Sequence, residues 1–328
     1  MTSRNNSRAW LPVLAFFAGG TLAQSAAAQG WVPERHVEFV APAAAGSSMD
    51  NITRTVERLA RESKLLPVSS AVVNRSGGEH TIAYHSLKQR AGDPHVLAVA
   101  SQVLLTNHIS GRQSISHADV TPISMLLAEH YIAIVHKDSP IKTGRDLVEA
   151  LRRNPESISI AVGNLSQRLA VAMVLQAGEV DMKRVRIPVI TGGKNALTVA
   201  GGHVDVGVTS IGQTMPLVSA GNLRVLAVSG PKRLGGLFAA APTWAELGYE
   251  KATFVAWRGV IAPPGITPQQ IAYWENLILQ VAEHEELRTI AERHQWEIFY
   301  RNAADTRRFM DQEYPQLKKV MTEFGLLK

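Results

Sequence analysis

Two small polar turns in this 328-residue sequence carry residue types that bind anions. The first follows the apolar run 37–40 and consists of Ala44, Ala45, Gly46, Ser47 and Ser48. A helical pattern begins directly after it, and N–H groups at a helix N-terminus bind negative charge because the helix dipole adds partial positive charge there. We therefore expect ligand contacts from the backbone N–H groups of the first three residues and from the two serine hydroxyls. The alternative is an ordinary turn whose small residues only save space.

The second turn, residues 163–169, repeats the order of strand, polar turn and helix. Asn164, Ser166 and Arg168 are its candidate ligand contacts, and we expect Ser166 to cap the helix. Arg168 would lie in the first helical turn, where a positive charge opposes the helix dipole. A ligand carboxylate bound by two guanidinium N–H groups would justify an arginine there. A solvated arginine that points away from any cleft is the alternative.

A third turn, residues 191–194, contains paired glycines, which permit positive φ angles and close approach of a ligand to the backbone. We expect the N–H group of Gly193 and the side chain of Thr209 to contribute to the same site. His203 and Asp205 alternate nearby and have the chemistry of metal ligands. No third ligand lies close in the sequence, so we predict neither a metal site nor a cofactor.

Short apolar runs alternate with helical patterns along the chain, which predicts an α/β architecture. The first helix carries an apolar stripe at Ile52, Val56 and Leu59. Further strands are predicted at 70–73, 96–100, 132–135, 158–162, 204–209 and 223–228. Further helices are predicted at 81–89, 144–153, 166–177, 195–200, 268–288 and 305–324. Because no low-complexity linker separates two halves, we expect two lobes between which the chain crosses twice, near 128–136 and 254–264.

Residues 1–28 have the order of a secretory signal peptide: Arg4 and Arg8 precede an apolar core, and a run of alanines ends at Ala28. The core, 9–22, is shorter than the roughly 20 residues that span a membrane, which argues against an anchor. The arginines are not adjacent, so a twin-arginine signal is not predicted. We therefore expect export to the periplasm, cleavage after Ala28 and a soluble mature protein.

The composition narrows the class of protein. The sequence is 45% hydrophobic and 19% charged, which suits a globular chain with a large core, and it has no cysteine. Thiol chemistry and thiolate metal sites are therefore excluded. The formal charge of +6 falls by two without Arg4 and Arg8, and the basic residues are scattered rather than grouped into a nucleic-acid-binding stripe. Mild basicity is also common in exported proteins that bind anions.

Motifs for catalysis are missing from the sequence. It contains no Gly-x-Ser-x-Gly, His-Glu-x-x-His, Walker A or Gly-x-Gly-x-x-Gly motif. Paired carboxylates for glycoside hydrolysis depend on proximity in space, which a sequence does not test. We predict that the protein is not an enzyme.

Six segments carry a resemblance to a known protein family: APAAAGSSMDNITR, VVNRSGGEHTIA, GGKNALTVAGGHVDV, GNLRVLAVSGPKR, APTWAELGY and FVAWRGVIAPPGITPQQI. Together they resemble the periplasmic solute-binding proteins of tripartite tricarboxylate transporters, also called the Bug or TctC family. The resemblance covers nearly the whole mature chain. The last four segments are the most specific, since their order and spacing match together.

The resemblance implies a type II periplasmic-binding-protein fold, in which two α/β lobes close over a small ligand. Residues 29–131 and 253–328 would form lobe one, and residues 132–252 would form lobe two. The ligand would be a small carboxylate held between the three turns described above. The implied partners are the small and large membrane subunits of a tripartite tricarboxylate transporter. We expect a monomer that binds no nucleic acid.

Two departures from the family pattern bear on the ligand. Arg168 takes the place of the family's second-lobe histidine, in a turn shortened by one residue, and favours a carboxylate over a neutral amide. Met49 adds bulk near a position that is small in the family, and an occluded cleft is an alternative. A different role is also open, in which the protein presents its ligand to the outer domain of a sensor kinase, since both roles use the same closed shape.

Overall fold

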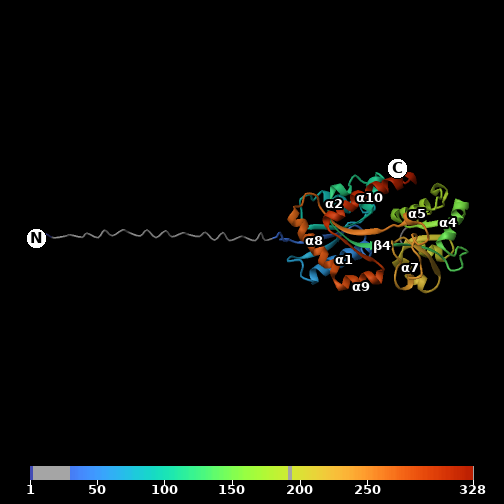
Figure 1. Ribbon diagram of the computed structural model, residues 1–328, viewed down its shortest axis with the longest axis horizontal. Helices are drawn as coiled ribbons and strands as arrows, with labels where there is room; N and C mark the ends of the chain where they lie inside the picture. Colours follow the sequence, from blue (N-terminus) through green and yellow to red (C-terminus); the bar gives the residue numbers. More distant parts are fainter. Residues whose placement is uncertain (3–29, 191–193, 328) are drawn as a thin grey trace. The chain divides into compact units, whose positions relative to one another are not determined.

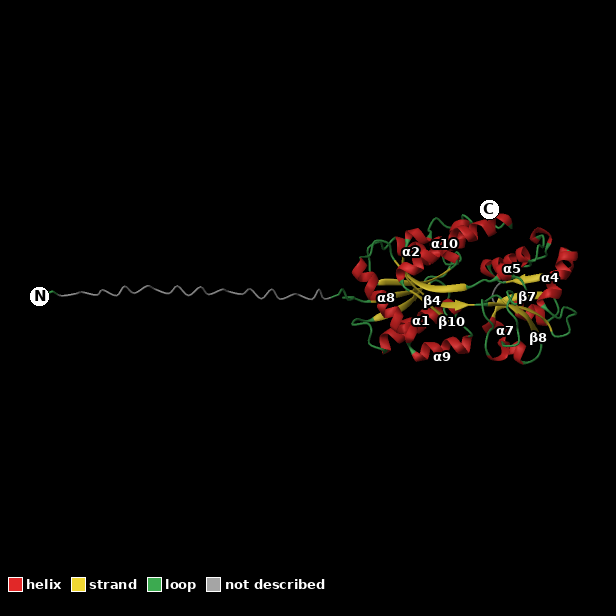
Figure 2. Cartoon of the chain, in the orientation of Figure 1, coloured by secondary structure: helices red, strands yellow, loops and turns green. Residues whose placement is uncertain are grey.

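Two β-sheets, each with helices on both faces, organise the chain (Figures 1 and 2). The computed structural model describes residues 1–2, 30–190 and 194–327, and the part from Trp31 onwards forms one compact unit. We call the larger sheet with its helices lobe one and the smaller sheet with its helices lobe two. Gly193, a predicted ligand contact, lies outside the described residues, as do residues 3–28 of the predicted leader.

Lobe one contains a six-stranded sheet in the order β10-β4-β9-β3-β1-β2. Its strands are β1 (Val37–Ala41), β2 (Ser70–Asn74), β3 (Val96–Ser101), β4 (Thr121–Glu129), β9 (Ala256–Ala262) and β10 (Glu297–Arg301). β1 pairs in parallel with β2 and β3, whereas β9 is antiparallel to both β3 and β4. A strand from the last quarter of the chain therefore completes the middle of a sheet that begins near the N-terminus.

Helices cover both faces of this sheet because its strands are apolar on both sides. One face packs against α1 (Ser48–Glu62), α8 (Pro268–Glu283) and α9 (Glu285–His294). The other packs against α2 (Thr81–Lys88), α3 (Val103–Ile109) and α10 (Ala303–Glu323). The predicted stripe of α1 is confirmed, since Ile52, Val56 and Leu59 are all buried in the first of these cores.

Lobe two contains a four-stranded sheet in the order β6-β7-β5-β8. Its strands are β5 (Tyr131–His136), β6 (Ile160–Val162), β7 (Val206–Ser210) and β8 (Leu223–Val228). Helices α4 (Gly144–Arg153) and α5 (Leu165–Ala177) pack on one face, and α6 (Asn195–Ala200) and α7 (Ile211–Ser219) pack on the other. Single 3-10 turns lie at His117–Asp119, Pro155–Ser157, Met182–Arg184, Gly236–Phe238 and Glu250–Ala252.

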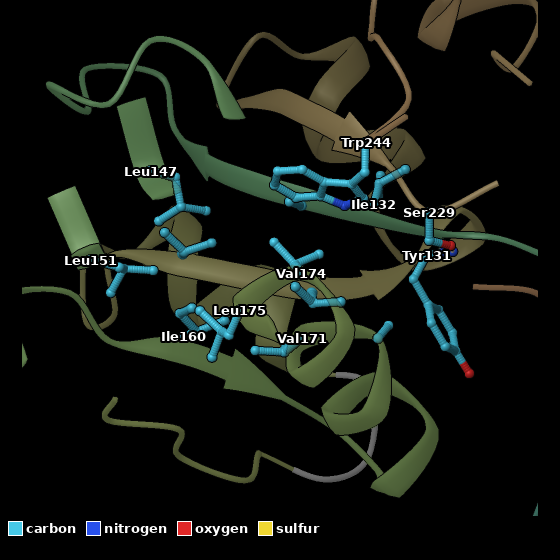
Figure 3. Close-up of a pocket in the computed structure, with 14 residues that line it drawn as sticks. Tyr131, Ile132, Leu147, Leu151, Ile160, Val171, Val174, Leu175, Ser229 and Trp244 are labelled. Carbon is cyan, nitrogen blue, oxygen red and sulfur yellow. The ribbon is translucent and has the colours of Figure 1, made fainter. Parts of the chain in front are cut away.

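The core under α4 and α5 is closely packed. A cavity of only about 20 Å³ remains there, among Leu147, Val174 and Trp244 and their apolar neighbours. Figure 3 shows that Tyr131 borders this cluster while its hydroxyl points away from it. A space of that size holds about one water-sized probe, so this cavity is a packing gap and not a ligand site.

The chain crosses between the lobes twice, as predicted. β4 ends at Glu129 and β5 begins at Tyr131, so the first crossing is the single residue His130. After β8, the last strand of lobe two, the chain runs through residues 229–255 and returns to lobe one as β9, which is the second crossing. The predicted α/β fold with two lobes is therefore confirmed, whereas the exact lobe boundaries stay predictions.

One predicted helix was wrong for an identifiable reason. The helix predicted at 268–288 is two helices, because His284 leaves the helical conformation (ψ 130°) and its side chain accepts a hydrogen bond from the Glu286 N–H group to cap α9. The last turn of α10 also reaches lobe two, where Phe324 packs against the core and Glu323 accepts a 2.5 Å hydrogen bond from Gln176 of α5. No helix in the described part of the chain is long and apolar enough to cross a membrane.

Candidate ligand-binding cleft

A cavity of about 470 Å³ lies between the lobes, in the size range of small-molecule sites. Lobe one contributes the start of α1, the loop before α2, the end of β3, Arg112 and a residue of β9. Lobe two contributes the start of β5 and the turn from β6 into α5. The polar lining residues are Ser47, Ser48, Glu79, His80, Ser101, Arg112, Tyr131, Asn164, Ser166, Arg168 and Arg258.

The turn before α1 is held by the buried carboxylate of Asp50. Its Oδ2 accepts hydrogen bonds from the Gly46 N–H group (2.8 Å) and from Arg54 (3.0 Å), and its Oδ1 accepts one from Asn74 (2.7 Å). Ser47 caps the helix, since its hydroxyl accepts a hydrogen bond from the Asp50 N–H group at 3.2 Å. The Gly46 N–H group is therefore already engaged, which corrects its prediction as a free donor to a ligand.

The turn before α5 is built differently from the prediction. Asn164, not Ser166, caps the helix, because its side chain accepts from the Gln167 N–H group at 2.9 Å. The Gln167 side chain in turn accepts from the Gly163 N–H group at 2.5 Å. Capping by Asn164 leaves the buried hydroxyl of Ser166 on the cleft side, near Tyr131.

Five of the ten predicted contact residues line the cavity: Ser47, Ser48, Asn164, Ser166 and Arg168. Ala44, Ala45 and Gly46 are exposed and are not part of its lining. Thr209 is fully buried elsewhere and forms hydrogen bonds to Asn195 (3.1 Å) and Gln213 (2.7 Å). Its role is to hold α6 and α7 against β7 rather than to face the cavity.

Arginines give the cavity its positive charge, and two of them are paired. Arg112 donates to Glu79 at 2.8 Å, and Arg258 donates to Glu129 at 2.6 Å. Arg168 has no carboxylate partner among the described residues, and its Nε atom is buried without a hydrogen-bond acceptor there. A buried donor without an acceptor costs free energy, so an anionic ligand group is a fitting partner.

Burial and the charge of Arg258 shift the pKa values of two side chains in the cavity wall, His80 and Tyr131. Burial lowers the pKa of His80 to about 4, and the nearby positive charge of Arg258 lowers it further in the same direction. Burial raises the pKa of Tyr131 to about 12, against the opposing effect of Arg258. Both side chains are therefore neutral at physiological pH.

Apart from Ser47 and Ser48, sequence reasoning missed the polar residues that lobe one contributes to this lining: Glu79, His80, Ser101, Arg112 and Arg258. Arg258 did carry a signal, since a charged residue inside the buried strand FVAWRGV needs a partner or a ligand. Glu79 and His80 directly follow the paired glycines of the segment VVNRSGGEHTIA, and paired glycines permit close approach of a ligand to the backbone. Nothing in the sequence indicated that Arg112 returns to the same cavity.

A second cavity, of about 270 Å³, lies where α5, α10 and residues 253–255 meet. Its wall includes Glu313, whose carboxylate accepts hydrogen bonds from Gln102 (2.5 Å) and from the Trp257 indole (2.6 Å). Glu313 as a whole is half-buried, but its carboxyl group is enclosed, and burial raises its pKa to about 7. This carboxyl group lies at the junction of the two lobes.

Comparison with known proteins fits this geometry. The profile of the family described as "Tripartite tricarboxylate transporter family receptor" (TctC) matches residues 52–326. The chain belongs to this family. The chain is 26% identical to the protein BugT of Bordetella pertussis over 243 residues, which span 73% of this chain and 74% of BugT.

Two solved structures share the fold. The periplasmic binding protein BugD has a TM-score of 0.74 at 21% identity, and the match covers 90% of this chain and 99% of BugD. R. palustris Rpa4515, solved with adipate, has a TM-score of 0.74 at 22% identity, with 89% and 98% covered. At these identities the likeness shows a shared fold and nothing of the ligand.

Proposed function

We propose that this protein captures a small carboxylate in the cleft between its lobes and delivers it to the membrane subunits of a tripartite tricarboxylate transporter. One observation carries the proposal: Arg168, without a carboxylate partner among the described residues, lines a cavity that two helix N-termini also border. Membership of a solute-binding family and the adipate of Rpa4515 support the same ligand class.

The working motion would be closure of the lobes over the ligand. The first crossing is a single residue, so a small backbone rotation there moves one lobe relative to the other. An ion pair between Lys232, after β8, and Glu297 of β10 (3.0 Å) joins the lobes in the present conformation. Delivery requires the protein to reach the periplasm, which we infer from its leader sequence and from the periplasmic location of BugD.

The test is ligand binding by the leader-free protein and by its Arg168→Ala variant. We expect a set of small carboxylates to raise the melting temperature of the wild type and calorimetry to give a dissociation constant for the strongest binder. Loss of a charged hydrogen bond should weaken that binding by about 1.5–3 kcal/mol, or roughly 10- to 150-fold.

Arg153→Ala is the matched control, because Arg153 is an exposed arginine in the last turn of α4, on the same lobe. Unchanged affinity in Arg168→Ala would show that this arginine does not hold the carboxylate. Equal loss in both variants would indicate a general effect on lobe two.

A further inference from the structure

The loop that precedes α2 holds four successive residues at positive φ. The angles are 127° at Gly77, 56° at Gly78, 49° at Glu79 and 76° at His80. Glycine adopts this region without steric cost, whereas Glu and His do so against a clash of Cβ with the backbone. Strain of this kind persists where the surrounding structure holds it, and it gathers at ligand sites.

Two hydrogen bonds hold this loop in place. Asn107 donates to the carbonyl oxygen of Glu79 at 2.9 Å, and the Tyr84 N–H group donates to that of His80 at 3.2 Å. Both strained residues line the cleft, and the His80 ring meets Tyr84 edge-on. The strained backbone therefore places one carboxylate and one neutral imidazole in the wall of the cleft.

The carboxylate of Glu79 changes the charge of the cleft. It neutralises Arg112 at 2.8 Å, just as Glu129 neutralises Arg258 at 2.6 Å. Residues 191–193 and the leader contain no Asp or Glu, so they supply no counter-charge for Arg168. Among the charged groups of the lining and their partners, one positive charge remains, and it lies on lobe two.

We propose that the ligand is a monocarboxylate with a neutral hydroxyl or carboxamide group: its carboxylate binds Arg168, and its neutral group binds the Glu79–Arg112 pair beside His80. This inference rests on the carboxylate function proposed above and names its substrate class. A hydroxyl or carboxamide both donates and accepts, so it can donate to Glu79 and accept from Arg112. A second carboxylate would lie against Glu79, and like charges at close range oppose binding.

The experiment compares acids of equal length that differ only at the far end. Calorimetry of the leader-free protein is performed with adipate, adipic acid monoamide, ω-hydroxyhexanoate and the corresponding shorter acids. We expect a monoamide or hydroxy acid to bind at least about tenfold more tightly than the dicarboxylate of the same length.

Two variants then remove the negative charge of Glu79. Glu79→Gln keeps the side-chain shape, and Glu79→Gly also relieves the positive φ, so the glycine variant folds even if the loop tolerates no other change. In both, Arg112 loses its counter-charge, and the preference should move toward the dicarboxylate by about tenfold. Glu156→Gln is the control, because Glu156 pairs with Arg184 at 3.2 Å outside the cleft lining.

The outcomes separate the two proposals. Tighter binding of the dicarboxylate by the wild type, or a preference that Glu79→Gln and Glu79→Gly leave unchanged, overturns the monocarboxylate inference while the carboxylate function stands. Absence of binding by every acid of either charge overturns the carboxylate function and the inference with it. A shift toward the dicarboxylate in both variants, but not in Glu156→Gln, supports the inference.

Discussion

The enclosed carboxyl group of Glu313 should make the stability of this protein depend on pH. Its pKa is raised to about 7 by burial, although hydrogen bonds from Gln102 and Trp257 act in the opposite direction. In the unfolded chain the same group titrates near 4.5. The folded state therefore holds this proton more tightly, so the stabilisation is complete below pH 4.5, declines as the pH rises and is lost above about 7.

The magnitude follows from the interval between the two pKa values. At about 1.4 kcal/mol per pH unit, the full effect is about 3 kcal/mol, and about 2 kcal/mol of it should disappear between about pH 5.5 and about pH 8.5. Glu313→Gln cannot ionise, so it removes this dependence. The Gln102 Oε1 atom is buried and has no hydrogen-bond partner among the described residues. If the Gln102 amide flips, this oxygen can accept a hydrogen bond from the new amide N–H group of the Glu313→Gln variant.

The assay is urea unfolding of wild type and Glu313→Gln at both pH values. The stability of the wild type minus that of the variant should fall by about 2 kcal/mol from the lower to the higher pH, and this difference cancels the other titrating groups. Glu149→Gln, an exposed position on α4, should show no such change. A difference for Glu313→Gln that stays constant with pH would refute the reasoning, because the group would then titrate at its ordinary pKa.

Two further predictions concern the elements that position the cleft. Gly259→Ala should destabilise the protein by about 1–3 kcal/mol in urea unfolding, because the new Cβ would lie 2.6 Å from the backbone oxygen of Ser124. The control is Gly212→Ala, which has open space around the new Cβ and should be neutral or slightly stabilising. An equal effect of both would show that β4 and β9 can move apart. Asp50→Asn should cost about 1–3 kcal/mol, since an amide N–H would face one of the donors from Gly46, Arg54 or Asn74. An unchanged melting temperature of Asp50→Asn would show that the turn before α1 does not depend on this carboxylate.

The sequence predicted elements where one local signal was strong. The stripe of α1 was confirmed, because helical periodicity acts over a few residues. β4 was missed as a strand: it is buried along nearly its whole length, so it shows no alternation of apolar and polar residues. Residues 268–288 were predicted as one helix because the apolar periodicity continues through them. The cap at His284 ends α8 and begins α9, and periodicity does not reveal such a cap.

The residues of the cleft were likewise predicted where they are contiguous in the sequence and missed where they are far apart. The turn around Arg168 was recognised because its strand, cap and helix are contiguous. The ion pairs that set the charge of the cleft join residues 33 positions apart (Glu79 and Arg112) and 129 positions apart (Glu129 and Arg258). Only the folded structure brings these residues together, so the sequence does not show that the cavity has three arginines of which two are paired.

The position of β9 has a consequence for the order of folding. This strand joins β4 to β3, and the chain reaches it only at Ala256–Ala262. Lobe two, whose strands all lie between Tyr131 and Val228, can pair its sheet before that point. Lobe one must wait with the edges of β3 and β4 unpaired, and such non-local pairing is slow. A nascent chain therefore leaves its larger lobe incomplete until most of it has been made.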